Sequence, residues 1–103
     1  MTDLEITAVS PERYRLSGEL DMASAGVMQE SLEPAVRAGG NLVLDVGELT
    51  FIDSSGIRAF VALAERMNGA APLVLSNVST SARRLFDIIG LETLPGIEVE
   101  SYA

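Results

Sequence analysis

The sequence predicts an α/β fold: a mixed, mostly parallel sheet of four or five strands with helices packed against it. Two short runs of alternating apolar residues open the chain, which is typical of half-buried strands. After them, short apolar runs that suit covered strands alternate with segments of helical periodicity. Repeated strand–helix–strand units with right-handed crossovers produce a parallel sheet, to which the opening hairpin adds one antiparallel strand.

The hairpin is predicted from residues 4–9 and 13–20, which place their apolar and small side chains on one face. The turn Ser10-Pro11-Glu12 separates the two runs. A connection this short joins neighbouring antiparallel strands, so the two runs are expected to pair with each other.

The first helix is predicted directly after Asp21, whose carboxylate suits the N-cap position. Its buried face is formed by apolar residues at helical spacing: Ala25, Met28, Leu32, Ala35 and Val36. Pro34 lies within this pattern and predicts either a kink or a stop and restart. Gly39 and Gly40 are expected to end the helix.

Two further strands and a second helix follow. Residues 42–46 (LVLDV) and 72–78 (PLVLSNV) are short apolar runs, which predicts strands covered on both faces. Between them, helical spacing begins at Ile57 and predicts a helix that ends at Asn68 and Gly69.

The last helix carries clear signals at both ends. Ser79 suits the N-cap, Gly90 the C-terminal position, and Leu91 the hydrophobic contact that accompanies such an ending. The inward stripe comprises Ala82, Leu85, Phe86 and Ile89. Residues 96–100 (GIEVE) predict a final strand.

Composition narrows the possible chemistry. The chain contains no His, Cys or Lys, and all seven of its positive charges are Arg. It therefore lacks a thiolate nucleophile, an imidazole base, an ordinary zinc site and the lysine of phosphate-binding loops. We expect no catalytic residues, no metal site and no cofactor.

Length and charge point to a single binding module. A chain of 103 residues suits one domain, residues 1–103. The formal charge of −8 opposes binding to nucleic acid or to an anionic membrane surface, because both are polyanions. The absence of Cys excludes disulfides and makes the cytoplasm the expected location.

The candidate site lies where strands end and helices begin, because ligand and partner sites of such sheets gather there. The residues expected at this rim are Asp21, Asp53, Ser54, Ser55, Gly56, Asn77 and Ser79. Four of them form the consecutive segment DSSG, at positions 53–56.

Four interpretations of DSSG are open. One of Asp53, Ser54 or Ser55 caps a helix, with Gly56 permitting a tight turn. A catalytic serine is disfavoured, because the chain has no His or Lys to serve as its base. A magnesium site formed by Asp21 and Asp53 is disfavoured, since acidic N-caps explain both residues more simply. Finally, an exposed hydroxyl at a helix start can enter another protein's active site as a phosphate acceptor.

Three segments carry a family resemblance: GELD (18–21), LDVGELTFIDSSGI (44–57) and RLFDIIGL (84–91). With them, the chain resembles the STAS domain family, and more closely its small single-domain bacterial anti-sigma factor antagonists. The resemblance extends from about Leu4 to Val99. It implies a STAS-type, SpoIIAA-like fold.

The resemblance implies a regulatory function without enzymatic activity. The antagonist binds an anti-sigma factor that is also a serine kinase of the GHKL ATPase type, which releases a sigma factor. Phosphorylation of Ser54 breaks the complex, and a PP2C-type phosphatase restores it. The partner-binding surface comprises the acceptor Ser54 together with Asp21, Asp53, Ser55 and Gly56. Within this set, Ser55 is also expected to be the structural cap.

A second interpretation remains within the same fold. The chain is alternatively a STAS subunit of an ABC-type lipid-transport complex, or part of a stressosome-like scaffold. These proteins share the architecture and differ in partner. A complete DSSG segment in an acidic, free-standing domain favours the antagonist.

Overall fold

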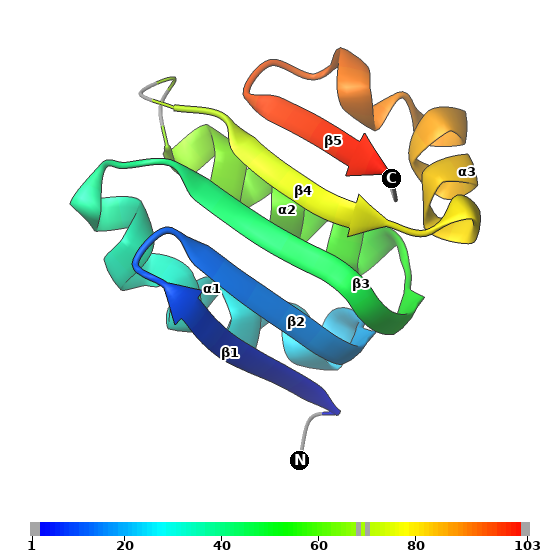
Figure 1. Cartoon of the computed structure of the whole chain (residues 1–103). Helices are drawn as coiled ribbons and strands as arrows, with labels where there is room; N and C mark the ends of the chain where they lie inside the picture. The colour runs from blue at the N-terminus through cyan, green and yellow to red at the C-terminus, as the bar shows by residue number, and fades with distance from the viewer. Residues whose placement is uncertain (1–2, 68, 70, 102–103) are drawn as a thin grey trace.

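The computed structural model describes residues 3–67, 69 and 71–101. The elements follow one another in the predicted order (Figure 1): β1 (Leu4–Ser10), β2 (Arg13–Leu20), α1 (Met22–Ala38), β3 (Leu42–Ile52), α2 (Ser54–Arg66), β4 (Leu73–Val78), α3 (Thr80–Ile89), the 3-10 turn η1 (Leu91–Thr93) and β5 (Ile97–Ser101).

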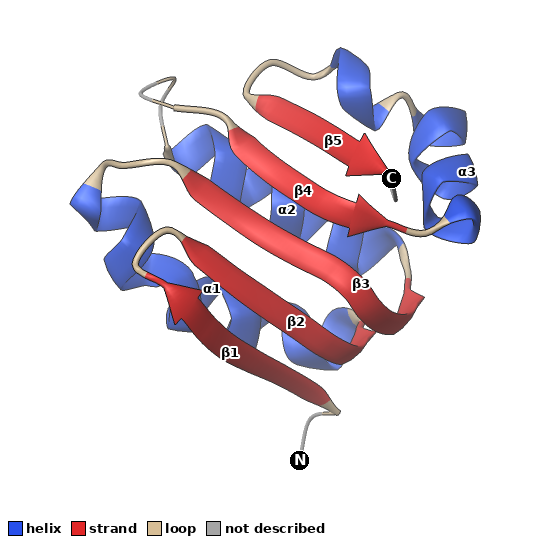
Figure 2. Ribbon diagram, in the orientation of Figure 1, coloured by secondary structure: helices blue, strands red, loops and turns tan. Residues whose placement is uncertain are grey.

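The five strands form one sheet in the order β1-β2-β3-β4-β5. β1 is antiparallel to β2, and the other neighbouring pairs are parallel, which confirms the predicted mixed, mostly parallel sheet. α1 and α2 lie behind the sheet in Figure 1, and α3 lies beside β5 near the carboxyl ends of the last strands. In Figure 2, no helix of the described chain covers the face turned to the viewer.

The core fills the space between the sheet and its helices. Its largest fully buried side chains are Leu16, Leu20, Met28, Leu32, Leu42, Leu44, Phe60, Leu63, Leu73, Leu75, Phe86 and Leu91. Strands and helices alike contribute to this list, so removal of apolar surface from water joins the two layers. Among residues 3–67, 69 and 71–101, every helix is too short or too polar to cross a bilayer.

α1 differs from expectation at Pro34. The helix is continuous from Met22 to Ala38, so the predicted stop and restart is wrong. Proline removes only the N–H that would bond the carbonyl of Glu30, and Glu30 is exposed, where water can satisfy that carbonyl. Gly39 ends the helix as expected, in the left-handed conformation at φ 80°.

β3 is longer than predicted. It continues beyond the apolar run 42–46 to Ile52. The apolar run does not extend this far, because the second half of the strand alternates partly buried residues with the exposed Glu48 and Thr50. The pairing of β2 with β3 is irregular, with register shifts between Arg15 and Ser17 and again before Glu19. A strand with such irregularities does not produce a continuous apolar run.

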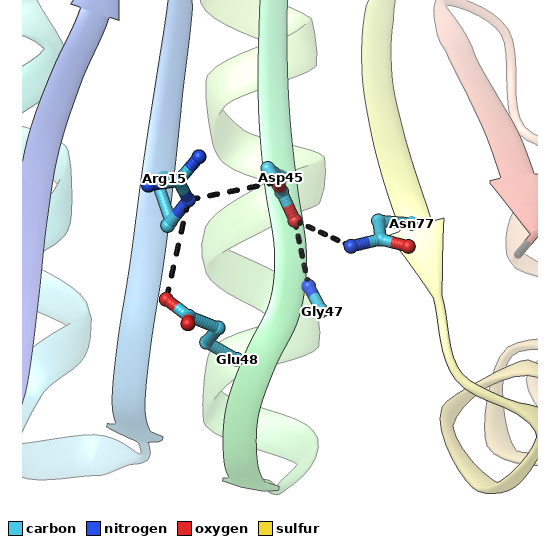
Figure 3. A network of polar contacts seen from close by, with 5 residues as sticks. All are labelled: Arg15, Asp45, Gly47, Glu48 and Asn77. Atoms are coloured by element: carbon cyan, nitrogen blue, oxygen red, sulfur yellow. Dashed lines mark hydrogen bonds and ion pairs between the residues drawn. The ribbon is translucent and has the colours of Figure 1, made fainter.

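A polar network on the side of the sheet away from α2 accompanies the first irregularity (Figure 3). Asp45 Oδ1 accepts hydrogen bonds from Gly47 N–H (2.9 Å) and from Asn77 Nδ2 (3.3 Å). Arg15 Nε lies 3.7 Å from Asp45 Oδ2 and 4.0 Å from Glu48 Oε2. A Cβ atom at position 47 would collide with the Asn77 amide, so this arrangement requires glycine. Asn77, expected at the rim, has its side chain committed to this network.

The two later helices largely follow the predicted boundaries. α2 ends at Arg66 with Met67 as C-cap, and the predicted terminator Asn68 lies outside the described residues. Ser79 Oγ accepts the N–H of Ala82 at 3.2 Å, which confirms it as the N-cap of α3. Gly90 ends α3 at φ 70°, and the buried Leu91 then begins a 3-10 turn that the sequence did not predict.

Candidate functional site

The turn from β3 into α2 is organised by Asp53. Its extended backbone makes it the N-cap, and its Oδ1 accepts hydrogen bonds from Ser55 N–H (2.9 Å) and Gly56 N–H (3.2 Å). The expectation that Ser55 is the cap is therefore wrong. Ser55 already belongs to the helix, whereas a capping side chain must come from the residue before it and reach forward to the free N–H groups.

Gly56 serves close packing rather than the tight turn that was expected. It lies inside α2 and is buried. A Cβ atom there would lie 2.8 Å from both Leu20 Cγ and the Leu20 carbonyl oxygen, and 2.9 Å from Ile52 Cγ1. The absence of a side chain lets the first turn of α2 rest against the ends of β2 and β3.

The turn from β2 into α1 lies directly beside DSSG, because Asp53 N–H donates to the Leu20 carbonyl at 3.3 Å. Asp21 caps α1 by accepting from Ala23 N–H (3.0 Å) and Ser24 N–H (3.1 Å). Ser24 Oγ accepts the N–H of Asp21 at 3.0 Å, which completes a capping box. The structure thus brings Asp21 and Asp53 to one edge of the sheet, where Asp21 caps α1 and Asp53 caps α2.

The hydrogen bonds of Asp21 and Asp53 are also relevant to the interpretation of these two residues as a magnesium site. Nowhere in the described part of the chain do three or more Asp and Glu residues gather in a group that could hold a metal ion. Both carboxylates accept backbone hydrogen bonds at helix starts, so the N-cap role accounts for each of them.

Within the DSSG segment, Ser54 is exposed, whereas Asp53 and Ser55 are partly buried and Gly56 is buried. Ser54 occupies the first position of α2 and opens onto a hollow of about 380 Å³ between α2 and the segment from α3 to Leu94. The other lining residues are Ile52, Asp53, Ile57, Arg58, Leu85, Ile89, Leu91 and Leu94. An exposed hydroxyl therefore stands beside a largely apolar concavity, as is typical of surfaces that bind other proteins.

A second hollow of about 230 Å³ adjoins the first, between the end of β3 and the start of α3. Phe51 and the predicted rim residue Ser79 line it, and Ile52 and Leu85 line both hollows. Phe51 is half exposed, and Met22, next to Asp21, is exposed over 80% of its surface. Apolar side chains thus border the DSSG turn on more than one side.

Sequence reasoning missed part of this site. Ile89, expected on the inward stripe of α3, is 46% exposed and lines the hollow beside Ser54. Arg58, which lines the same hollow, was assigned no function from the sequence. Two signals were present: Arg58 stands four residues after Ser54, and the pair Ile88-Ile89 is more apolar than a one-sided stripe requires.

Chemically, the arrangement suits an acceptor better than a catalyst. Ser54 has an accessible oxygen, yet the chain offers no His or Lys to take its proton. The neighbouring carboxylate of Asp53 is occupied by two backbone N–H groups. A reaction at Ser54 thus needs a base and a donor supplied by another molecule.

Comparisons with known proteins agree with this geometry. Residues 7–97 match the family model described as "Mlab, STAS domain". The anti-sigma-B factor antagonist of Bacillus subtilis (strain 168) is 34% identical over 92 residues, which cover 86% of this chain and 83% of that protein. The protein of the same name from Listeria monocytogenes is 34% identical over 88 residues, covering 84% and 75%.

Solved structures share the fold at lower identity. A putative anti-sigma factor antagonist from Thermotoga maritima superposes with a TM-score of 0.76 at 13% identity, covering 96% of this chain and 86% of that one. The unphosphorylated form of the anti-sigma factor antagonist SpoIIAA gives a TM-score of 0.67 at 20% identity, covering 97% and 89%. By its sequence match over residues 7–97 and by its fold, the chain belongs to the STAS domain family.

Proposed function

We propose that this chain is an anti-sigma factor antagonist, a single-domain protein that binds an anti-sigma factor at the DSSG edge and so frees a sigma factor. The observation that carries the proposal is the position of Ser54. It is exposed, lies at the start of α2 directly after the N-cap Asp53, and opens onto an apolar hollow. The 34% identity to two anti-sigma-B factor antagonists over most of the chain supports it.

In the proposed cycle, the anti-sigma factor is a serine kinase of the GHKL type. It transfers the γ-phosphoryl group of ATP to Ser54 Oγ, takes up the hydroxyl proton and releases ADP. A PP2C-type phosphatase hydrolyses the phosphoserine and restores the hydroxyl. Asp21, Asp53, Ser55 and Gly56 shape the surface around the acceptor, and the chain itself supplies neither catalytic residue nor cofactor.

Electrostatics explains why such a modification would break a complex. A phosphate adds about −1.5 to −2 charges at neutral pH. It would stand next to the Asp53 carboxylate, on a chain that already carries a formal charge of −8. A partner covering the neighbouring apolar hollow would have to desolvate that phosphate, which is unfavourable without a matching cation.

SpoIIAA offers a structural precedent for a phosphorylated state. Its phosphorylated form has also been solved and shares this fold, with a TM-score of 0.64 at 23% identity. A domain of this architecture thus tolerates a phosphate group. The proposed cycle would take place in the cytoplasm, where sigma factors act.

The experiment is to incubate the purified chain with ATP and candidate GHKL-type anti-sigma factors, and to locate phosphate by mass spectrometry. We expect phosphate on Ser54 in the wild type and in Ser55→Ala, and none in Ser54→Ala. Phosphate on Ser55 or Ser79 with Ser54 unmodified would show that the acceptor is not Ser54. A chain that stays unmodified and binds ABC-transporter subunits would instead support the lipid-transport interpretation.

A further inference from the structure

The surroundings of Ser54 leave little backbone capacity for a phosphate. Isolated helix N-termini offer several free N–H groups to an anion. In α2, the N–H groups of Ser55 and Gly56 are held by Asp53 Oδ1, and that of Ile57 by the Asp53 carbonyl oxygen at 3.1 Å. A phosphate on Ser54 would therefore meet the Asp53 carboxylate, and the donors of Ser55, Gly56 and Ile57 are already engaged. A nearby cation would stabilise it.

Arg58 is placed to supply that cation. It follows Ser54 by four residues in the same helix, is exposed, and lines the same hollow. Side chains at i and i+4 are neighbours on a helix surface, with Cβ atoms roughly 5–6 Å apart. The order is also the favourable one, with the anion nearer the N-terminus, and a guanidinium can hold two phosphate oxygens at once.

Among the described residues, four other arginines form ion pairs with Asp or Glu side chains. Arg15 faces Asp45 and Glu48, Arg37 and Arg66 both contact Glu33, and Arg83 contacts Asp87. Within residues 3–67, 69 and 71–101, no ion pair of this kind engages Arg58. Arg58 is exposed and lines the hollow next to the acceptor.

We propose that Arg58 is the intramolecular receptor of a phosphate on Ser54, an inference that rests on the proposed phosphorylation of that serine. In the unmodified chain, the guanidinium is available to an acidic side chain of the partner. In the phosphorylated chain, the phosphate holds it. Phosphorylation then both adds an anion to the binding edge and removes a cation from it, while the ion pair keeps the helix start neutralised.

The test uses chains with phosphoserine installed at position 54 during synthesis, so that it does not depend on any kinase. The second pKa of the phosphate is followed by phosphorus NMR in a pH titration at low ionic strength. A nearby cation favours the dianion and lowers this pKa. Replacing the cation in Arg58→Gln or Arg58→Ala should therefore raise it, by about 0.2 to 0.4 units.

Arg13→Gln is the matched control. It removes the same charge from the amino-terminal end of β2, at the far end of the strand from Asp21, and should leave the phosphate pKa unchanged. Added salt should reduce the difference between wild type and Arg58→Gln. Arg58→Lys keeps a cation and should restore most of the wild-type value.

Two results would overturn the inference: a phosphate pKa in both Arg58→Gln and Arg58→Ala within about 0.1 unit of wild type, or an equal rise in Arg13→Gln. Because the phosphoserine is installed synthetically, a chain that no kinase modifies would refute the proposed function without changing this readout. Conversely, an unshifted pKa in a chain that is phosphorylated at Ser54 would refute only the assignment of Arg58.

Discussion

Gly56 and Gly26 both lie inside helices, but their surroundings differ. A Cβ atom at Gly56 would meet the Leu20 and Ile52 side chains at 2.8–2.9 Å, whereas nothing lies within 4 Å of one at Gly26. We expect Gly56→Ala to destabilise the fold by about 1–3 kcal/mol through overpacking. Gly26→Ala, the control, should stabilise it by roughly 0.5–1 kcal/mol. Urea unfolding of both variants measures the difference, and a Gly56→Ala chain as stable as wild type would contradict the close packing.

The capping function of Asp53 can be separated from its charge. Asp53→Ala removes the acceptor of two backbone N–H groups and should cost about 1 kcal/mol of unfolding free energy. Asp53→Asn keeps an acceptor oxygen and should lose much less, because Asn is an equally good N-cap. The midpoint of urea unfolding reports both. A larger loss of unfolding free energy in Ser55→Ala than in Asp53→Ala would indicate that Ser55, and not Asp53, caps the helix.

Among the elements, α1 and α2 are joined by an ion-pair cluster. Glu33 of α1 forms an ion pair with Arg66 of α2, and its Oε1 accepts a hydrogen bond from Arg37 Nε at 3.0 Å. Hydrogen bonds from Arg66 and then Arg37 hold the pKa of Glu33 below its ordinary value. The folded chain therefore binds this proton less readily than the unfolded chain does, and the stabilisation is present above the unfolded pKa.

We expect Glu33→Gln to lower the thermal unfolding midpoint at neutral pH. The difference from wild type should vanish as the pH falls through the lowered pKa of Glu33, because protonation then removes the same charge from wild type. Melting curves from pH 7 down to acidic pH measure this. A difference that is constant across the range would indicate a loss of packing rather than of charge.

The sequence predicts those elements whose signals are local. The caps at Asp21, Ser79 and Gly90 were predictable because each acts within one helical turn. The full length of β3 was not, because its second half is held by irregular pairing with β2 and by a hydrogen bond from Thr50 Oγ1 to the Gly18 carbonyl, which is distant in sequence. Extended pairing of this kind leaves no apolar pattern to follow.

For the candidate site too, some features could be predicted from the sequence and others could not. DSSG and its place at the strand ends followed from element order and from the family resemblance. The hollow beside Ser54 did not, because it forms between α2 and residues from α3 to Leu94 that lie more than twenty-five positions later in the sequence. The exposure of Ile89 depends on how α3 is tilted against the sheet, which periodicity alone does not specify.

At the scale of the whole molecule, the proposed switch requires a domain that stays folded while its surface changes. The acceptor belongs to an exposed first turn, whereas the core residues of α2, such as Phe60 and Leu63, are fully buried behind it. A phosphate on Ser54 therefore alters charge at one edge without entering the core. We expect the phosphorylated chain to melt within a few degrees of the unmodified one, a change of about 1 kcal/mol or less.

The most direct test of the central claim is calorimetric titration of the anti-sigma factor with two forms of this chain, unmodified and phosphorylated on Ser54. The unmodified chain should bind, and the phosphorylated chain should bind at least about tenfold more weakly, a difference of about 1.4 kcal/mol. Equal affinities of the two forms, with both folded, would contradict the account of Ser54 as the switch.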